Sequence, residues 1–238
     1  MHASIHPCIH PPPIHSRFAF EQVLCQFASI TGNIRVARHW PNLTTVTMNG
    51  KTVIGSLSVF GASTPNLSTL VLTKTGVTGE LGDLGQCPLS KLDLYGTQVG
   101  GDIASLVAQP DLIELYLSYC DVVGDVATLA ANNLYLTRIL LDYTYVLGDV
   151  ACFDGNTALL EIGLAYSQCT GRLDSLYGCT SLEFLNLYGV RGFEGLGAGD
   201  DAKEAKRLVK ALKKALSAPT LCAKAVVEGR TKTCDVTI

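Results

Sequence analysis

The sequence predicts an α/β solenoid, a stack of short coils that each contribute one strand to a parallel sheet. Three observations predict this fold. An apolar pattern recurs every 22 to 24 residues, and a glycine falls in the same frame of seven copies. Apolar and polar residues also alternate at the start of each copy, as in a half-buried strand. Because one such coil cannot bury its own apolar face, neighbouring coils must stack.

The repeat is clearest from Leu67 to Leu84, where the chain reads L-x-x-L-x-L-x-x-T-x-V-x-G-x-L-x-x-L. Eight copies begin at residues 20, 43, 67, 89, 112, 136, 159 and 182. The first and last copies match the pattern less well, and the last has no glycine in the shared frame. The solenoid is therefore predicted over residues 20–199.

Each part of the repeat has a physical reason. The x-x-L-x-L segment has period 2 and predicts a short strand on the concave face. A threonine follows, as at Thr97, where its hydroxyl can bond to backbone groups of the turn. The glycine permits a turn that a Cβ would hinder. Two apolar residues three apart, such as Ile103 and Leu106, predict a 3₁₀ or α-helical turn on the convex face.

This pattern resembles the leucine-rich repeat, and in particular the plant-type class whose units end in Gly-x-Ile-Pro. The chain departs from that class in two ways. Thr, Ser or Cys stands where asparagine is usual after the strand, and the proline after Gly-x-Ile is missing. The resemblance implies a role in protein–protein interaction, as a recognition or scaffolding module.

Composition excludes several other classes of protein. Apolar residues make up 47% of the chain and charged residues 16%, which excludes a disordered protein. The net charge of −3 argues against sequence-independent binding to nucleic acid. No apolar run reaches the roughly 18 residues of a membrane-spanning helix. The first residues show no secretory signal, and nine cysteines is an odd number. Both features favour the cytoplasm, with an extracellular location expected if the chain is a fragment.

The sequence carries no catalytic or cofactor signature. It contains no G-x-S-x-G, H-E-x-x-H, G-x-x-x-x-G-K or C-x-x-C. We therefore expect a non-catalytic protein without a cofactor. His6, Cys8, His10 and His15 suggest a metal site in the His- and Pro-rich segment 1–19, but its prolines resist a fixed geometry. We expect a flexible segment without a metal.

Residues 200–238 predict an amphipathic helix over 200–216 followed by a tail. At 100° per residue its basic residues share one face and its apolar residues the opposite face. The first interpretation is a cap that covers the last coil. The alternative is a helix that binds an anionic membrane surface or an acidic partner. Its basic residues are Lys203, Lys206, Arg207, Lys210, Lys213 and Lys214.

The exposed positions of the predicted strands carry charges and aromatic rings. One position gives a row of alternating charge, Lys91, Glu114, Arg138 and Glu161, which neighbouring strands favour because opposite charges attract. The following positions gather six of the nine tyrosines and two acids. These residues are Tyr95, Tyr116, Tyr119, Tyr143, Tyr166, Tyr188, Asp93 and Asp142.

Two interpretations of the tyrosines stay open at this stage. Aromatic pairs on neighbouring strands stabilise a sheet, but rigid, amphipathic rings are also what binding surfaces favour. We expect these residues and the charged row to bind a protein or peptide, with a glycan as the minor alternative. Another possibility is a recognition fragment of a larger receptor-like or signalling protein. The third is attachment to a membrane surface through the helix at 200–216.

Overall fold

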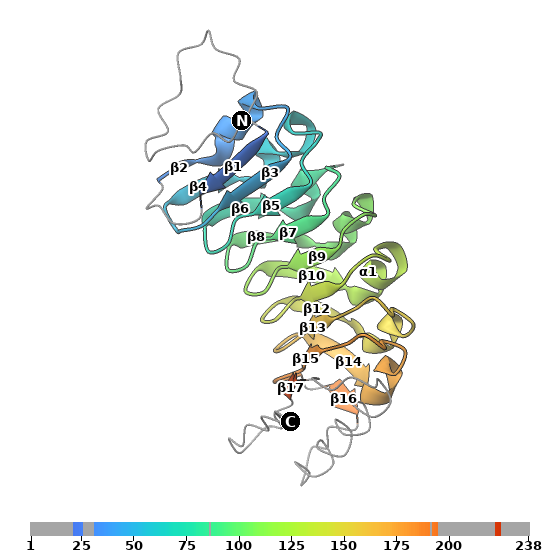
Figure 1. Ribbon diagram of the computed structural model, residues 1–238. Coiled ribbons are helices and arrows are strands. Elements are labelled where there is room, and N and C mark those ends of the chain that lie inside the picture. Colours follow the sequence, from blue (N-terminus) through green and yellow to red (C-terminus); the bar gives the residue numbers. More distant parts are fainter. Residues whose placement is uncertain (1–20, 26–30, 86, 191, 195–221, 225–238) are drawn as a thin grey trace.

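The structure is a computed structural model that describes residues 21–25, 31–85, 87–190, 192–194 and 222–224. These residues form a solenoid whose coils stack in chain order (Figure 1). The predicted α/β solenoid is therefore confirmed. The predicted flexible segment at 1–19, with its four candidate metal ligands, and the predicted helix at 200–216 lie outside the described residues.

The first sheet has nine parallel strands within the described ranges. They are β1 (Gln22–Cys25), β3 (Thr45–Met48), β5 (Thr69–Val71), β7 (Lys91–Asp93), β9 (Glu114–Tyr116), β11 (Arg138–Leu140), β13 (Glu161–Gly163), β15 (Phe184–Asn186) and β17 (Cys222–Lys224). One of the first eight strands falls in each predicted copy of the repeat. The last strand, β17, comes from the segment predicted as a tail and pairs with β15.

A second parallel sheet follows the turn of each coil, and the sequence did not predict it. Among the described residues it has eight strands. They are β2 (Gly32–Asn33), β4 (Val53–Ser56), β6 (Gly76–Glu80), β8 (Gln98–Asp102), β10 (Asp121–Asp125), β12 (Tyr145–Asp149), β14 (Gln168–Arg172) and β16 (Gly192–Glu194). The V-x-G part of the repeat, interpreted as a turn, lies in these strands, with a buried valine such as Val77.

A short helical segment closes each coil from the first to the seventh, as predicted. The 3₁₀ helices are η1 (Ile34–His39), η2 (Leu57–Val59), η3 (Gly61–Ser63), η4 (Leu81–Leu84), η5 (Ile103–Ala108), η6 (Val150–Phe153) and η7 (Leu173–Leu176), and α1 is Val126–Asn132. Asp102, Asp125 and Asp149 each cap such a segment by accepting an N–H at 2.8 Å. No helix in the described part of the chain is long and apolar enough to cross a membrane.

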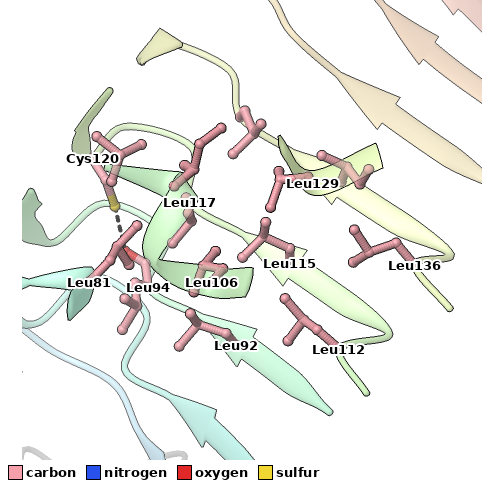
Figure 2. Close-up of a cluster of buried hydrophobic side chains, with 14 of the residues drawn as sticks. Leu81, Leu92, Leu94, Leu106, Leu112, Leu115, Leu117, Cys120, Leu129 and Leu136 are labelled. Atoms are coloured by element: carbon pink, nitrogen blue, oxygen red, sulfur yellow. Dashed lines mark hydrogen bonds between the residues drawn. The ribbon is translucent and has the colours of Figure 1, made fainter. Parts of the chain in front are cut away.

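The core is a column of apolar side chains that runs between the two sheets. Figure 2 shows part of it, with leucines from neighbouring coils gathered together, among them Leu92, Leu115 and Leu117. All three are fully buried. The same positions recur in every coil, so each coil buries the apolar face of its neighbour. Stacking thus achieves the burial that a single coil could not achieve by itself.

A small side chain closes the turn after three of the first-sheet strands, β5, β7 and β11, as predicted. The hydroxyls of Thr75, Thr97 and Thr144 donate to the carbonyl oxygen three residues earlier, at 2.6 to 2.8 Å. In the coil between the last two, the thiol of Cys120 donates instead to the carbonyl oxygen of Leu94 at 3.0 Å (Figure 2). The carbonyl oxygens of Leu72 and Leu94 also accept the backbone N–H of Thr75 and Thr97, at 3.3 and 3.1 Å, so these side chains reinforce turns that the backbone already closes.

Five of the described cysteines carry free thiols. Four are buried, and Cys152 is half-buried. Burial raises the pKa of every one of these thiols, to about 12 for Cys152 and about 11 for Cys179. A thiol that stays protonated is a poor nucleophile. These five side chains therefore act as small packing groups.

Candidate functional site

A continuous column of tyrosine rings lies beside the first sheet. Tyr95, Tyr119, Tyr143, Tyr166 and Tyr188 come from five consecutive coils, and we call them the tyrosine ladder. Neighbouring ring centroids are 4.4 to 5.5 Å apart. The rings of Tyr119 and Tyr143 are stacked with 14° between their planes. The terminal pairs meet edge to face, another favourable aromatic geometry. The structure thus brings together five of the six tyrosines singled out from the sequence.

The three central tyrosines have a left-handed backbone. Their φ angles are 60° at Tyr119, 55° at Tyr143 and 54° at Tyr166. The coils on either side place glycine at the same position, Gly96 and Gly189, and the coil before Gly96 places Lys74 there with a φ of 56°. A side chain with a Cβ pays about 1–2 kcal/mol for this conformation. Each of the three tyrosines is held there by donating its N–H to a carbonyl oxygen of the next coil, at 2.7 to 2.9 Å.

We expect Tyr143→Gly to be more stable than Tyr143→Ala. Both variants lose the ring contacts with Tyr119 and Tyr166, but only glycine also removes the left-handed strain. The expected difference in the free energy of unfolding is about 1 kcal/mol in favour of glycine. Urea denaturation of the two variants would measure it, and equal stability would mean that the backbone at this position is unstrained.

A hollow of about 350 Å³ opens beside the tyrosine ladder, on the face of the first sheet that points away from the core. Six residues selected from the sequence line it: Asp93, Tyr95, Tyr116, Tyr119, Asp142 and Tyr143. Tyr166 and Tyr188 continue the ladder beyond the hollow. The structure therefore joins the two acids and most of the tyrosines into one site.

Asp142 is the most firmly held acid of the hollow. Its Oδ1 accepts hydrogen bonds from the N–H of Ala165 at 2.8 Å and from Nδ2 of Asn186 at 3.0 Å. Its Oδ2 accepts from the hydroxyl of Ser118 at 3.3 Å. Burial raises the pKa of Asp142 above its ordinary value, although these hydrogen bonds act in the opposite direction. Among the described residues, no cationic side chain forms an ion pair with this carboxylate.

Gly163 leaves space for the side chain of Asp142, which accepts a hydrogen bond from Asn186 two coils further along the chain. It lies between Leu140 and Asn186 in the register of the first sheet. A Cβ on Gly163 would lie 2.7 Å from Oδ2 of Asp142 and 2.9 Å from Cδ2 of Leu140. The sequence analysis gave no role to Gly163, Asn186 or the small Ala165. The available signal was a coil with Gly163 in its strand and Ala165 just after it, at positions where the neighbouring coils carry larger side chains.

Asp93 is the second acid of the hollow. Its Oδ1 accepts the N–H of Tyr95 at 3.0 Å. Burial raises the pKa of Asp93, opposed by this bond, by a hydrogen bond with Thr73 and by the charge of Lys91. Both acids of the hollow are thus partly desolvated carboxylates that depend on neutral hydrogen-bond donors.

The predicted row of alternating charge forms a chain of ion pairs beside the hollow. Lys91 Nζ lies 2.6 Å from Glu114 Oε2, and Arg138 lies 2.8 Å from Glu114 and 3.0 Å from Glu161. Lys91 also lies 5.3 Å from the ring centroid of Tyr116. None of the four charged residues lines the hollow. Because these four side chains already form ion pairs with one another, the row is best explained as a set of cross-strand contacts that hold neighbouring strands in register.

We expect Asp142→Asn to raise the thermal stability of the protein at neutral pH. Because the folded state raises the pKa of Asp142 above 3.8, it binds this proton more tightly than the unfolded chain does. The stabilising contribution is therefore complete below the unfolded pKa and is lost as the pH rises through the folded pKa. Asparagine can keep the bonds to Ala165, Asn186 and Ser118 without a charge.

Thermal unfolding at several pH values checks this expectation. The variant should have the higher Tm at pH 7, and the gap should close near pH 3, where the wild type is also neutral at this position. The titratable groups of the same hollow, Asp93, Tyr116, Tyr119 and Tyr143, are identical in both proteins. A gap of the same size at both pH values would exclude the buried charge as its cause.

A scan of protein-family models finds no match for this sequence, and a search of curated proteins finds none either. Solved structures do match. One is the Arabidopsis receptor kinase HAESA in complex with the peptide hormone IDA and the co-receptor SERK1, with a TM-score of 0.63 and 22% identity over 73% of this chain and 30% of that chain. Another is PEPR1–AtPEP1, with a TM-score of 0.62 and 20% identity over 71% of this chain and 28% of that one.

A bacterial protein is similar over most of its own length. Internalin C2 of Listeria monocytogenes matches with a TM-score of 0.57 and 17% identity, over 79% of this chain and 76% of that chain. At these identities the likeness concerns the fold, and the chain has the leucine-rich repeat fold that its repeat indicates. It spans less than a third of the HAESA and PEPR1 chains.

Proposed function

We propose that this protein is a non-catalytic recognition module that binds a protein or peptide through the tyrosine ladder and the adjoining hollow. One observation carries the proposal. Tyr119, Tyr143 and Tyr166 stay 49%, 44% and 43% exposed while their backbone adopts a conformation that glycine occupies in the neighbouring coils. Lys74 has the same conformation two coils before Tyr119, so this backbone belongs to the repeat; what distinguishes these three coils is that exposed, stacked rings occupy the position one after another.

Rigid, stacked rings are well suited to binding. A tyrosine offers a large amphipathic surface, and it loses little conformational freedom in a complex when its neighbours already hold it. Residues of this kind dominate the energetics of many protein interfaces. The tyrosine ladder would therefore supply most of the contact area, and the hollow would supply selectivity.

The comparisons support a protein or peptide as the ligand over a glycan. HAESA was solved with a peptide hormone and PEPR1 with AtPEP1. Because this chain spans less than a third of either, they also favour a second candidate function, the recognition part of a larger receptor-like or signalling protein. Binding to a membrane surface through Lys203 and its basic neighbours remains a prediction, because those residues lie outside the described ranges.

Affinity capture with the immobilised full chain tests the proposed function. The variant Tyr119→Gly/Tyr143→Gly/Tyr166→Gly should lose a partner that the wild type retains. The matched control is Tyr135→Ser/Tyr145→Thr, which removes two tyrosines of 65% and 57% exposure outside the tyrosine ladder. Loss in the folded triple variant with retention in the control supports the proposal. Undiminished capture by the triple variant contradicts it.

A further inference from the structure

We infer that the hollow recognises a guanidinium group, the side chain of an arginine in the bound protein or peptide. The inference rests on the proposed function, because that arginine belongs to the partner that the tyrosine ladder binds. It adds the chemical class of the group that enters the hollow.

The first argument is charge. Asp142 and Asp93 place two carboxylates in one partly desolvated hollow. Within the described part of the chain, neither carboxylate forms an ion pair, and the nearby Lys91 is bound to Glu114 at 2.6 Å. Burying an uncompensated charge is costly. A cation from a partner would offset that cost. An apolar group would leave the charge uncompensated, and an anionic group would add repulsion.

The second argument is the aromatic wall. The rings of Tyr95, Tyr119 and Tyr143 line the same hollow as the two acids, and the face of an aromatic ring attracts a cation. This protein already makes such contacts nearby, since Lys74 Nζ lies 5.4 Å from the ring centroid of Tyr95. A site with carboxylates and tyrosine rings together attracts a cation by two independent effects.

The third argument separates guanidinium from ammonium. A guanidinium is planar, weakly hydrated and stacks on aromatic rings, and its five N–H donors form a fork that fits carboxylates. An ammonium is compact and strongly hydrated, so it gains less from flat rings and loses more on entering a hollow. The volume of about 350 Å³ lies at the lower end of the roughly 300–1,000 Å³ of small-ligand sites, which suits a single long side chain.

The orientation of the Asp142 carboxylate is also fixed by hydrogen bonds. Its three hydrogen bonds come from Ser118, Ala165 and Asn186, on three different coils. The carboxylate is therefore held in place before a ligand arrives, so little ordering cost is left for binding. Gly163 keeps the space that this position requires.

The test uses N-acetylarginine amide, N-acetyllysine amide and N-acetylcitrulline amide as ligands of the full chain. Citrulline has the shape of arginine without its charge. Backbone amide NMR signals of Ala165 and Tyr95, whose N–H groups donate to Asp142 and Asp93, report on the hollow. We expect saturable shifts with the arginine amide, weaker binding of the lysine amide and no binding of the citrulline amide. Equal binding of the arginine and citrulline amides, or of the arginine and lysine amides, would overturn the assignment of a guanidinium.

Asp142→Asn provides the decisive variant, with Asp111→Asn, an exposed loop residue, as the control. Binding of the arginine amide should fall at least tenfold in the first and stay unchanged in the second. The captured partner then separates this inference from the proposed function. If the triple tyrosine variant loses the partner while Asp142→Asn binds it with wild-type affinity, the binding face stands and the guanidinium site is wrong. Loss of the partner in both supports the site.

Discussion

Leu117→Ala should lower the free energy of unfolding by about 2–5 kcal/mol, the usual cost of truncating a fully buried leucine. Leu117 is 0% exposed and lies in the stacked core drawn in Figure 2. Its N–H donates to the carbonyl oxygen of Leu140 in the next coil at 2.9 Å. Since both sheets fix the spacing of the coils, the neighbours have little freedom to fill the cavity. Urea denaturation measures the loss.

Leu134→Ala is the matched control for this variant. Leu134 is 65% exposed, and the same change there should alter stability by no more than about 0.5 kcal/mol. If both variants lost the same stability, the burial of the repeated leucines would not be what stabilises the core. The assignment of inward and outward positions would then be wrong.

Gly124→Ala should destabilise the protein by about 2–4 kcal/mol, through three effects that add. Gly124 has a φ of +119°, which strains any residue with a Cβ. The new methyl group would lie 2.8 Å from Cγ1 of Ile103 in the preceding coil. It would also clash with the carboxylate of Asp102, which caps η5 by accepting the N–H of Ala104 at 2.8 Å.

Gly50→Ala separates the backbone strain from the contact between coils. Gly50 has a similar φ of +114°, but a Cβ there would have no atom within 4 Å. Its loss should be near 1 kcal/mol, the backbone strain alone. Thermal or urea unfolding of both variants gives the comparison. A loss at Gly50 as large as that at Gly124 would show that close stacking of the coils is not what selects glycine in this frame.

Much of the fold follows from the sequence because each coil repeats the same local pattern. The period-2 leucines, the threonine of the turn and the paired apolar residues of the helical turn all predict local structure without knowledge of neighbouring coils. The second sheet does not follow. Its strands contain a glycine such as Gly124, which weakens a strand, and they are held by pairing with other coils. The sequence therefore indicated a turn where the structure has a strand.

The site was predictable only in part. A constant offset between parallel strands places Tyr119, Tyr143 and Tyr166 in one column, so the clustering of rings follows from the repeat. Their left-handed backbone does not, because tyrosine is not favoured there. The position of Asp142 depends on Gly163, where a Cβ would lie 2.7 Å from its Oδ2, and on hydrogen bonds from Ala165 and Asn186 in the next two coils. Such an arrangement depends on the shapes of several coils at once, and no local motif encodes it.

The most direct test of the binding face is hydroxyl-radical footprinting of the full chain, free and with its captured partner. The five ladder tyrosines provide the signal, and Tyr135 and Tyr145, exposed outside the ladder, are internal controls. We expect Tyr119, Tyr143 and Tyr166 to lose reactivity in the complex while the two controls stay reactive. Protection of Tyr135 or Tyr145 with an unprotected tyrosine ladder would contradict the account and place the interface elsewhere.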